Sequence, residues 1–164
     1  MKILLAIALC FSLSGCLIIA GPMNVSAAAT MGPSSTMAVR STNSFTTRLN
    51  GFRAENGIAA VRQSTVLTRA AQAHAEDMNR RNYFSHRSNG GPNGTGLIAR
   101  ARSAGCNVRS VSENIARGQK DEIAVLTSWK NSPGHRRNML GRGMTEYGLG
   151  RSGDVWVMMF SNGC

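Results

Sequence analysis

The spacing of apolar residues changes along this chain, and that change restricts the possible folds more than any other feature of the sequence. Over most of the chain, apolar residues recur every three to four positions, as on one face of a helix. Near the end, two short apolar runs at 147–150 and 155–160 flank the polar segment 151–154, which is typical of a β-hairpin with buried strands. Helices followed by strands predict an α+β domain or a layered αβα domain.

Four helices are expected before the hairpin. Each is expected to begin at a residue that can cap or open a helix, and these residues are Ser44, Ser64, Gly96 and Asp121. The second helix carries a single apolar stripe, formed by Leu67, Ala70, Ala71, His74, Ala75 and Met78. Because His74 falls on that stripe, we interpret it as a packed core histidine rather than a ligand.

The segment 1–27 has the composition of a secretory signal peptide. Lys2 gives the N-terminal region a positive charge, and a nearly unbroken apolar run follows over 3–20. Small residues around Ala27 then provide a cleavage site. The alternative is a bacterial lipobox at 13–16, in which Cys16 becomes the lipidated first residue, and a retained anchor is a third interpretation. All three predict an exported protein, in the periplasm or secreted.

Residues 28–41 are mostly Ser, Thr, Gly, Ala and Pro, and we interpret them as a flexible linker that leads to one domain at 42–164. Outside the signal, that domain contains two cysteines, Cys106 and Cys164. Two cysteines in an oxidising compartment most simply pair, and the alternative is two free thiols. A disulfide between them would close a loop of 58 residues, and closing a loop of that length stabilises a fold by about 4 kcal/mol in the chain-entropy model.

The chain is strongly basic, with a net charge of +11 that comes from 16 arginines and three lysines. Such a charge favours anionic surfaces such as envelope polymers or acidic lipid. The arginines are spread along the chain and aromatic residues are few, so the composition disfavours a nucleic-acid role.

Three short segments each place one chemically capable side chain beside turn residues: His86, Glu113 and His135. Two imidazoles and a carboxylate can hold zinc, with water in the fourth position. The same trio could also exchange protons without a metal, because histidine titrates near neutral pH. No serine lies in a Gly-x-Ser-x-Gly turn, which disfavours a serine hydrolase.

The order of these segments resembles the bacterial branch of the CAP superfamily, also called SCP domains. The similar segments are 73–75, 83–86, 112–116, 128–140 and 147–150, and the resemblance extends from about Ser44 to Phe160. It implies a three-layer αβα sandwich with a central antiparallel sheet and a large cleft. In that family the cleft holds two histidines and acidic residues that bind a divalent metal in some members, and His86, Glu113 and His135 match those positions.

Many members carry a second acidic residue after the tryptophan, where this chain has Lys, Asn and Ser at 130–132. The fourth position of the site is then either empty or filled by Glu146. The leading hypothesis is an exported CAP domain that binds a ligand in the His86, Glu113 and His135 cleft, together with a divalent metal such as zinc and without established catalysis. The alternatives are a metal-assisted hydrolase of envelope peptide or glycan, with Glu113 as its base, and an electrostatic binder of anionic envelope polymers.

Overall fold

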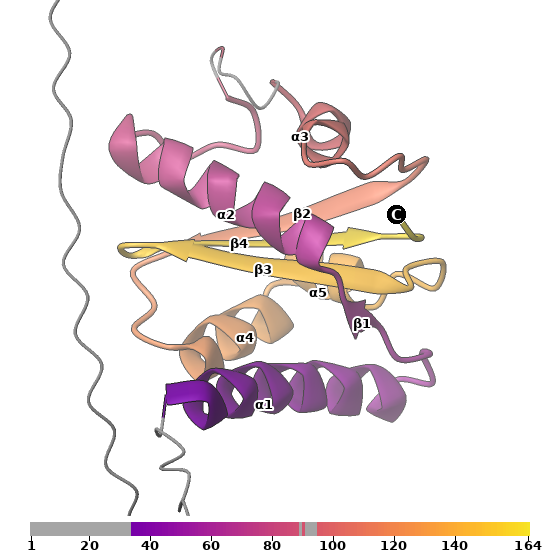
Figure 1. The fold of residues 1–164 in the computed structure, drawn as a ribbon. Coiled ribbons are helices and arrows are strands. Elements are labelled where there is room, and N and C mark those ends of the chain that lie inside the picture. The colour runs from indigo at the N-terminus through magenta and orange to yellow at the C-terminus, as the bar shows by residue number, and fades with distance from the viewer. Residues whose placement is uncertain (1–33, 89, 91–94) are drawn as a thin grey trace, which may run out of the picture. The chain divides into compact units, whose positions relative to one another are not determined.

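The structure is a computed structural model that describes residues 34–88, 90 and 95–164, with the backbone alone described over 34–44 (Figure 1). The predicted signal peptide, its lipobox alternative at Cys16 and the beginning of the predicted linker lie outside the described residues. Within the described ranges, no helix has both the length and the apolar character needed to cross a bilayer. The helices and strands follow in the order α1 (Ser34–Glu55), β1 (Arg62–Gln63), α2 (Thr65–Arg80), α3 (Leu97–Ser103), β2 (Val111–Arg117), α4 (Glu122–Asn131), α5 (Pro133–Met139), β3 (Glu146–Ser152) and β4 (Val155–Ser161).

The four strands form one sheet in the order β1-β3-β4-β2. Strands β3 and β4 make the predicted hairpin, and β2 pairs antiparallel with β4 so that Glu113 lies opposite Met159. Strand β1 adds two residues that run parallel to β3 at the other edge. The antiparallel sheet is therefore confirmed, with a short parallel addition that was not predicted because two residues carry no alternating pattern.

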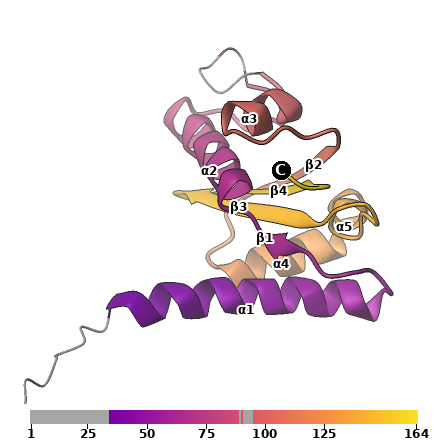
Figure 2. The same ribbon diagram turned by 45° about the vertical axis from the view of Figure 1, so that its right-hand side comes forward.

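The helices cover both faces of the sheet, which confirms the predicted three-layer αβα arrangement. Helices α2 and α3 lie on one face, and α1, α4 and α5 lie on the other (Figures 1 and 2). All seven residues of β4 are buried, because the strand packs against helices on both sides. Its side chains alternate between two hydrophobic clusters, one with Trp156, Met158 and Phe160 and the other with Val155, Val157 and Met159.

Local capping explains where two of the predicted helices begin. The Ser64 hydroxyl accepts a hydrogen bond from the Leu67 amide at 3.4 Å, and the Asp121 carboxylate accepts one from the Ala124 amide at 2.8 Å. Each bond satisfies an amide that has no partner within its helix. Pro133 occupies the first turn of α5, where the missing N–H of proline is not needed.

Helix α1 begins earlier than predicted, at Ser34 instead of Ser44, and so takes in residues 34–41 of the predicted linker. The sequence explains this difference, because Met37, Ala38 and Arg40 are good helix formers despite the surrounding Ser and Thr. Adding turns to an existing helix is also much easier than starting a new one. Residues 34–41 of the predicted linker are thus helical.

Two glycines of β3 allow α2 to pack directly on the sheet. A Cβ atom added at Gly148 would overlap the backbone of Leu67 and Thr68, and one added at Gly150 would overlap the backbone of Ala71 and Gln72. The sheet and α2 thus approach each other at a distance that no larger residue permits. This close contact fixes the position of α2, the helix that leads into the segment containing His86.

A disulfide joins Cys106, just after α3, to Cys164. Cys106 is fully buried in the cluster beneath α2 and α3, whereas Cys164 is exposed. The bond attaches the segment that leads into β2 to the residues that follow β4.

Candidate functional site

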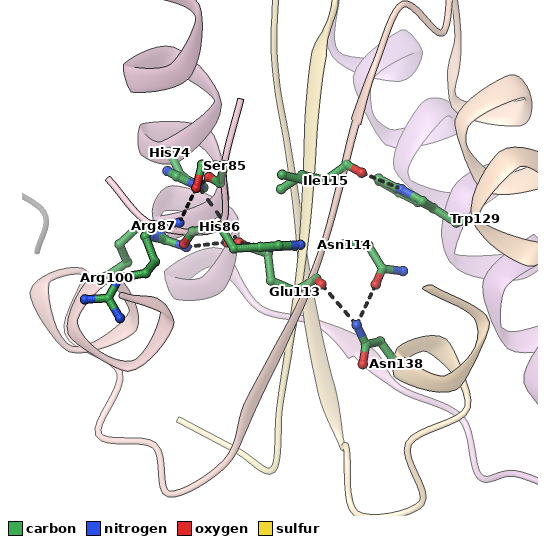
Figure 3. A network of polar contacts seen from close by, with 10 residues as sticks. All are labelled: His74, Ser85, His86, Arg87, Arg100, Glu113, Asn114, Ile115, Trp129 and Asn138. Carbon is green, nitrogen blue, oxygen red and sulfur yellow. Dashed lines mark hydrogen bonds and ion pairs between the residues drawn. The ribbon is translucent and has the colours of Figure 1, made fainter. Parts of the chain in front are cut away.

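The candidate site is built on β2, the edge strand of the sheet that contains Glu113 and Asn114. Successive residues of a strand face opposite sides of the sheet. Glu113 accordingly points toward the α2 and α3 side, whereas Asn114 points toward α5 (Figure 3). Both side chains are buried, with exposed fractions of 3% and 0%. Buried polar side chains need partners, and here the partners come from the loop that contains His86, from α2, from α3 and from α5.

The carboxylate of Glu113 is held by partners on both oxygens. Its Oε1 lies 2.8 Å from Nδ1 of His86, and its Oε2 accepts a hydrogen bond from the guanidinium of Arg100 at 2.8 Å. The same guanidinium nitrogen of Arg100 donates to the carbonyl of His86 at 2.9 Å. Arg100 thus binds both the carboxylate and the backbone of the residue that contacts it.

His86 is oriented by this carboxylate. With Nδ1 directed at Glu113, a proton on Nδ1 gives the best hydrogen bond and leaves Nε2 as the nitrogen with a free lone pair. The side chain of His86 is 48% exposed, so the ring remains accessible. A buried carboxylate behind an accessible imidazole is the arrangement that orients histidine ligands in metal sites.

His74 contributes a second, fully buried imidazole to the same network. Its Nε2 lies 3.1 Å from the carbonyl oxygen of Ser85 and 3.8 Å from Oε1 of Glu113. Burial lowers the pKa of His74, although the Glu113 charge acts in the opposite direction. The interpretation of His74 as a packed histidine is confirmed, and its contact with Ser85 supports the backbone next to His86.

His135 reaches the site from α5, and two asparagines attach this helix to β2. Asn138 donates from Nδ2 to the Glu113 carbonyl at 3.0 Å and to Oδ1 of Asn114 at 2.9 Å (Figure 3). Asn114 in turn donates from Nδ2 to the carbonyl of His135 at 3.1 Å. The backbone of His135 is therefore fixed relative to that of Glu113.

The two accessible imidazoles influence each other electrostatically. The pKa of His135 is lowered, first by partial burial and second by the nearby charge on His86. Because a lowered pKa keeps the ring neutral at neutral pH, His135 is available there as a lone-pair donor.

A divalent metal in this region would rely on the two accessible imidazoles. Nε2 of His86 and a ring nitrogen of His135 are the available donors, whereas Glu113 already has partners and lies behind His86. Within the described ranges, no three His, Cys, Asp or Glu side chains come together as a metal-binding group. A site with two protein ligands has fewer than the three found in catalytic zinc centres, so weaker binding is expected.

Glu146 is used elsewhere in the fold. One oxygen of its buried carboxylate pairs with Arg62, and the other accepts the backbone amide of Cys164 at 3.1 Å. Lys130, in the segment where the family resemblance implies an acid, places its ammonium 4.7 Å from the ring centre of Phe52 on α1. Neither residue supplies a fourth ligand to the histidines.

Several functional contacts were not predicted from the sequence. Arg100 could not be distinguished there from the other arginines, and Asn114 and Asn138 were noted only as parts of longer segments. One signal for Arg100 was present, because it occupies the same helical face as Leu97, Ala101 and Ala104 and so falls on an apolar stripe. A charged residue at a buried position needs a buried partner of opposite charge.

Comparison with known proteins gives one family match and several similar proteins. The model of the cysteine-rich secretory protein family, CAP, matches residues 46–160. Two curated proteins of Bacillus subtilis (strain 168) are similar. Uncharacterized protein YkwD is 34% identical over 113 residues, which are 68% of this chain and 43% of YkwD. Uncharacterized membrane protein YlbC is 33% identical over 101 residues, which are 62% of this chain and 28% of YlbC. The chain thus spans less than half the length of either relative.

Solved structures with the same fold include an extracellular SCP-domain protein from Bacillus anthracis str. Ames. It superposes with a TM-score of 0.66 at 27% identity, over 80% of this chain and 45% of that one. An outer surface protein from Borrelia burgdorferi gives a TM-score of 0.67 at 17% identity, over 76% of this chain and 94% of that one. The second similarity concerns the fold alone.

Proposed function

Because the chain belongs to the cysteine-rich secretory protein (CAP) family, we propose that it is an exported binding protein whose ligand site is centred on His86, Glu113 and His135. A divalent metal, zinc in the first instance, is held by the two accessible histidines and completes the site. The disulfide supports export, since such bonds persist in oxidising compartments. The extracellular Bacillus anthracis relative supports it as well.

One observation carries the proposal: the short contact between Nδ1 of His86 and the buried carboxylate of Glu113. Burying a carboxylate is unfavourable unless it is paired, and this one has Arg100 and His86 as partners. The arrangement fixes the ring of His86 with Nε2 directed away from the carboxylate. A surface histidine without a binding role would not need a buried carboxylate to orient its ring.

A bound zinc ion would supply a Lewis acid that attracts an anionic or carbonyl group of the ligand. The protein's own contribution is orientation, because Glu113 fixes the ring of His86 while Asn114 fixes the backbone of His135. Glu113 is less suited to act as a general base on water, since both of its oxygens are engaged and its side chain is fully buried. Binding is therefore better supported than the hydrolase alternative.

Zinc titration by calorimetry at pH 7.5 tests the proposal. The wild-type protein should bind one zinc ion, and His86→Ala and His135→Ala should each abolish measurable binding. Glu113→Gln should weaken binding by about 10- to 100-fold, as substitutions behind a metal-ligating histidine do. Glu76→Gln, which changes an exposed glutamate on α2, is the matched control and should bind as the wild type does.

Two other outcomes would contradict the proposal. The first is zinc binding that is absent or that survives both histidine substitutions. The second is binding to an anionic envelope polymer that vanishes at high salt and is unchanged in His86→Ala and His135→Ala, because this would identify purely electrostatic binding. Chelator-sensitive hydrolysis of an envelope substrate, lost in Glu113→Ala, would favour the enzyme alternative.

A further inference from the structure

The segment 83–86 carries His86 and belongs to none of the helices or strands. Three of its backbone carbonyls lie within hydrogen-bonding distance of a side-chain nitrogen. The three pairs are Arg117 with Tyr83 at 3.0 Å, His74 with Ser85 at 3.1 Å and Arg100 with His86 at 2.9 Å. Since these side chains belong to β2, α2 and α3, three elements together hold the backbone on which His86 sits.

The contact between His74 and Ser85 defines which nitrogen of His74 carries the proton. Its Nε2 faces the Ser85 carbonyl oxygen, which can only accept a hydrogen bond (Figure 3). Nε2 is therefore protonated in the neutral ring and donates to Ser85. The same nitrogen lies 3.8 Å from Oε1 of Glu113, the oxygen that contacts Nδ1 of His86. His74 thus adjoins both the backbone and the carboxylate that hold His86.

Packing alone does not account for a histidine at position 74. The side chain is fully buried, and its Nδ1 has no hydrogen-bond partner among the residues that the structure describes. A buried acceptor without a partner is unfavourable, and an apolar side chain at this position would avoid that cost. The hydrogen bond to Ser85 is the contact that an apolar side chain could not make.

Helix α2 has two buried polar side chains, His74 and Asp77, and both bind this segment. The Asp77 carboxylate accepts a hydrogen bond from the hydroxyl of Tyr83 at 2.6 Å. The other buried residues of α2 are Leu, Ala and Met. Polar side chains are therefore buried in α2 only where they contact the segment that carries His86.

We propose that His74 is a positioning residue of the ligand site, which holds His86 in its binding orientation without contacting the ligand or the metal. This role rests on the proposed function, because the orientation of His86 matters for binding only if its Nε2 is a ligand. The hydrogen bond from His74 fixes the Ser85 carbonyl, and the adjoining peptide then places the ring of His86 with Nδ1 on Glu113. Arg100 acts on the next carbonyl along the chain. Without the His74 donor, the ring of His86 should turn away from the carboxylate.

The tautomer of His86 in the metal-free protein tests this role, measured on the full chain as secreted by long-range ¹H–¹⁵N correlation at pH 8. In the wild type, His86 should be protonated at Nδ1 alone. His74→Phe keeps a buried ring but removes the donor, and His86 should then populate both tautomers. His74→Gln returns an N–H donor close to the position of Nε2 and should restore the single tautomer. His74→Asn places its amide near the position of Nδ1 and should not restore it.

Zinc titration by calorimetry provides the second measurement. His74→Phe should weaken zinc binding by about 10- to 100-fold, as substitutions behind a metal-ligating histidine do, and His74→Gln should recover most of the affinity. Leu67→Met is the matched control, because it conserves volume at a buried position on the same face of α2. It should change neither the tautomer of His86 nor the zinc affinity. A histidine that serves packing alone predicts the same null result for His74→Phe.

The positioning role is overturned if His74→Phe keeps both the single tautomer and the wild-type zinc affinity, or if His74→Gln is no closer to the wild type than His74→Asn. The second comparison decides the question even where His74→Phe does not fold. Failure of the proposed function gives a different result, since the wild type then binds no zinc while the tautomer of the metal-free protein still reports the orientation of His86.

Discussion

At the scale of single residues, a buried, a partly buried and an exposed histidine share a small region around β2 with one buried carboxylate. Burial is the largest cause of the lowered pKa values of His74 and His135, and the charge of His86 adds to it for His135. These rings are therefore held neutral in the folded protein. Because the same rings titrate at their ordinary pKa in the unfolded chain, the free energy of unfolding of the domain depends on pH.

Acidification should destabilise the fold. His74 and His135 have folded pKa values below the ordinary value of 6.5, so the unfolded chain binds more protons once the pH falls below about 6.5. The free energy of unfolding should thus be fully retained above that pH and should decrease as the pH falls toward the folded pKa values. Urea denaturation at pH 7.5, 6.5 and 5.5 measures it. In His135→Gln the decrease should be smaller, and a pH-independent free energy in the wild type would contradict the argument.

The sequence placed His86, Glu113 and His135 in one site only through the resemblance to a family. Spacing along the chain does not determine which loops meet in space, and these three residues come from a loop, a strand and a helix. Arg100 was missed for a different reason. Its pairing with Glu113 is a tertiary contact between α3 and β2, and neither residue's neighbours in sequence reveal it.

At the scale of elements, α2, α4 and the hairpin were predictable because their signals are local. Ser64, Asp121 and Pro133 mark helix ends by their own chemistry. Strand β2 was not predicted, because three consecutive polar residues, Ser112, Glu113 and Asn114, interrupt its apolar pattern. The polar residues of the candidate site are thus the reason that the strand was not predicted.

Gly150→Ala should be strongly destabilising. The new methyl group would overlap the backbone of α2, which cannot move without separating the helix from the sheet. We expect a loss of about 3 kcal/mol or more in the free energy of unfolding, at the upper end for overpacked positions. Chemical denaturation measures it. Gly51→Ala is the matched control, since a Cβ at this position in α1 contacts nothing within 4 Å, and it should stabilise the helix by about 0.5–1 kcal/mol.

At the scale of the whole molecule, the disulfide is the covalent link between the α2–α3 layer and the end of the chain. Its sequence separation is 58 residues. Replacing both Cys106 and Cys164 by alanine should lower the free energy of unfolding by about 4 kcal/mol, because the unfolded chain regains its freedom. Denaturation of the secreted protein with and without reductant provides the same comparison. Two free thiols in freshly secreted protein, detected by mass, would refute the pairing.

The order of strands in the sheet has a consequence for how the protein matures. Strand β2 has a single neighbour, β4, and that neighbour follows it in the chain by the length of two helices and another strand. During synthesis, β2 therefore has no strand to pair with until residues 155–161 have emerged. Such a long-range pairing slows folding relative to helix formation. The sheet contacts of the candidate site around Glu113 therefore form only once the last strand of the sheet is available.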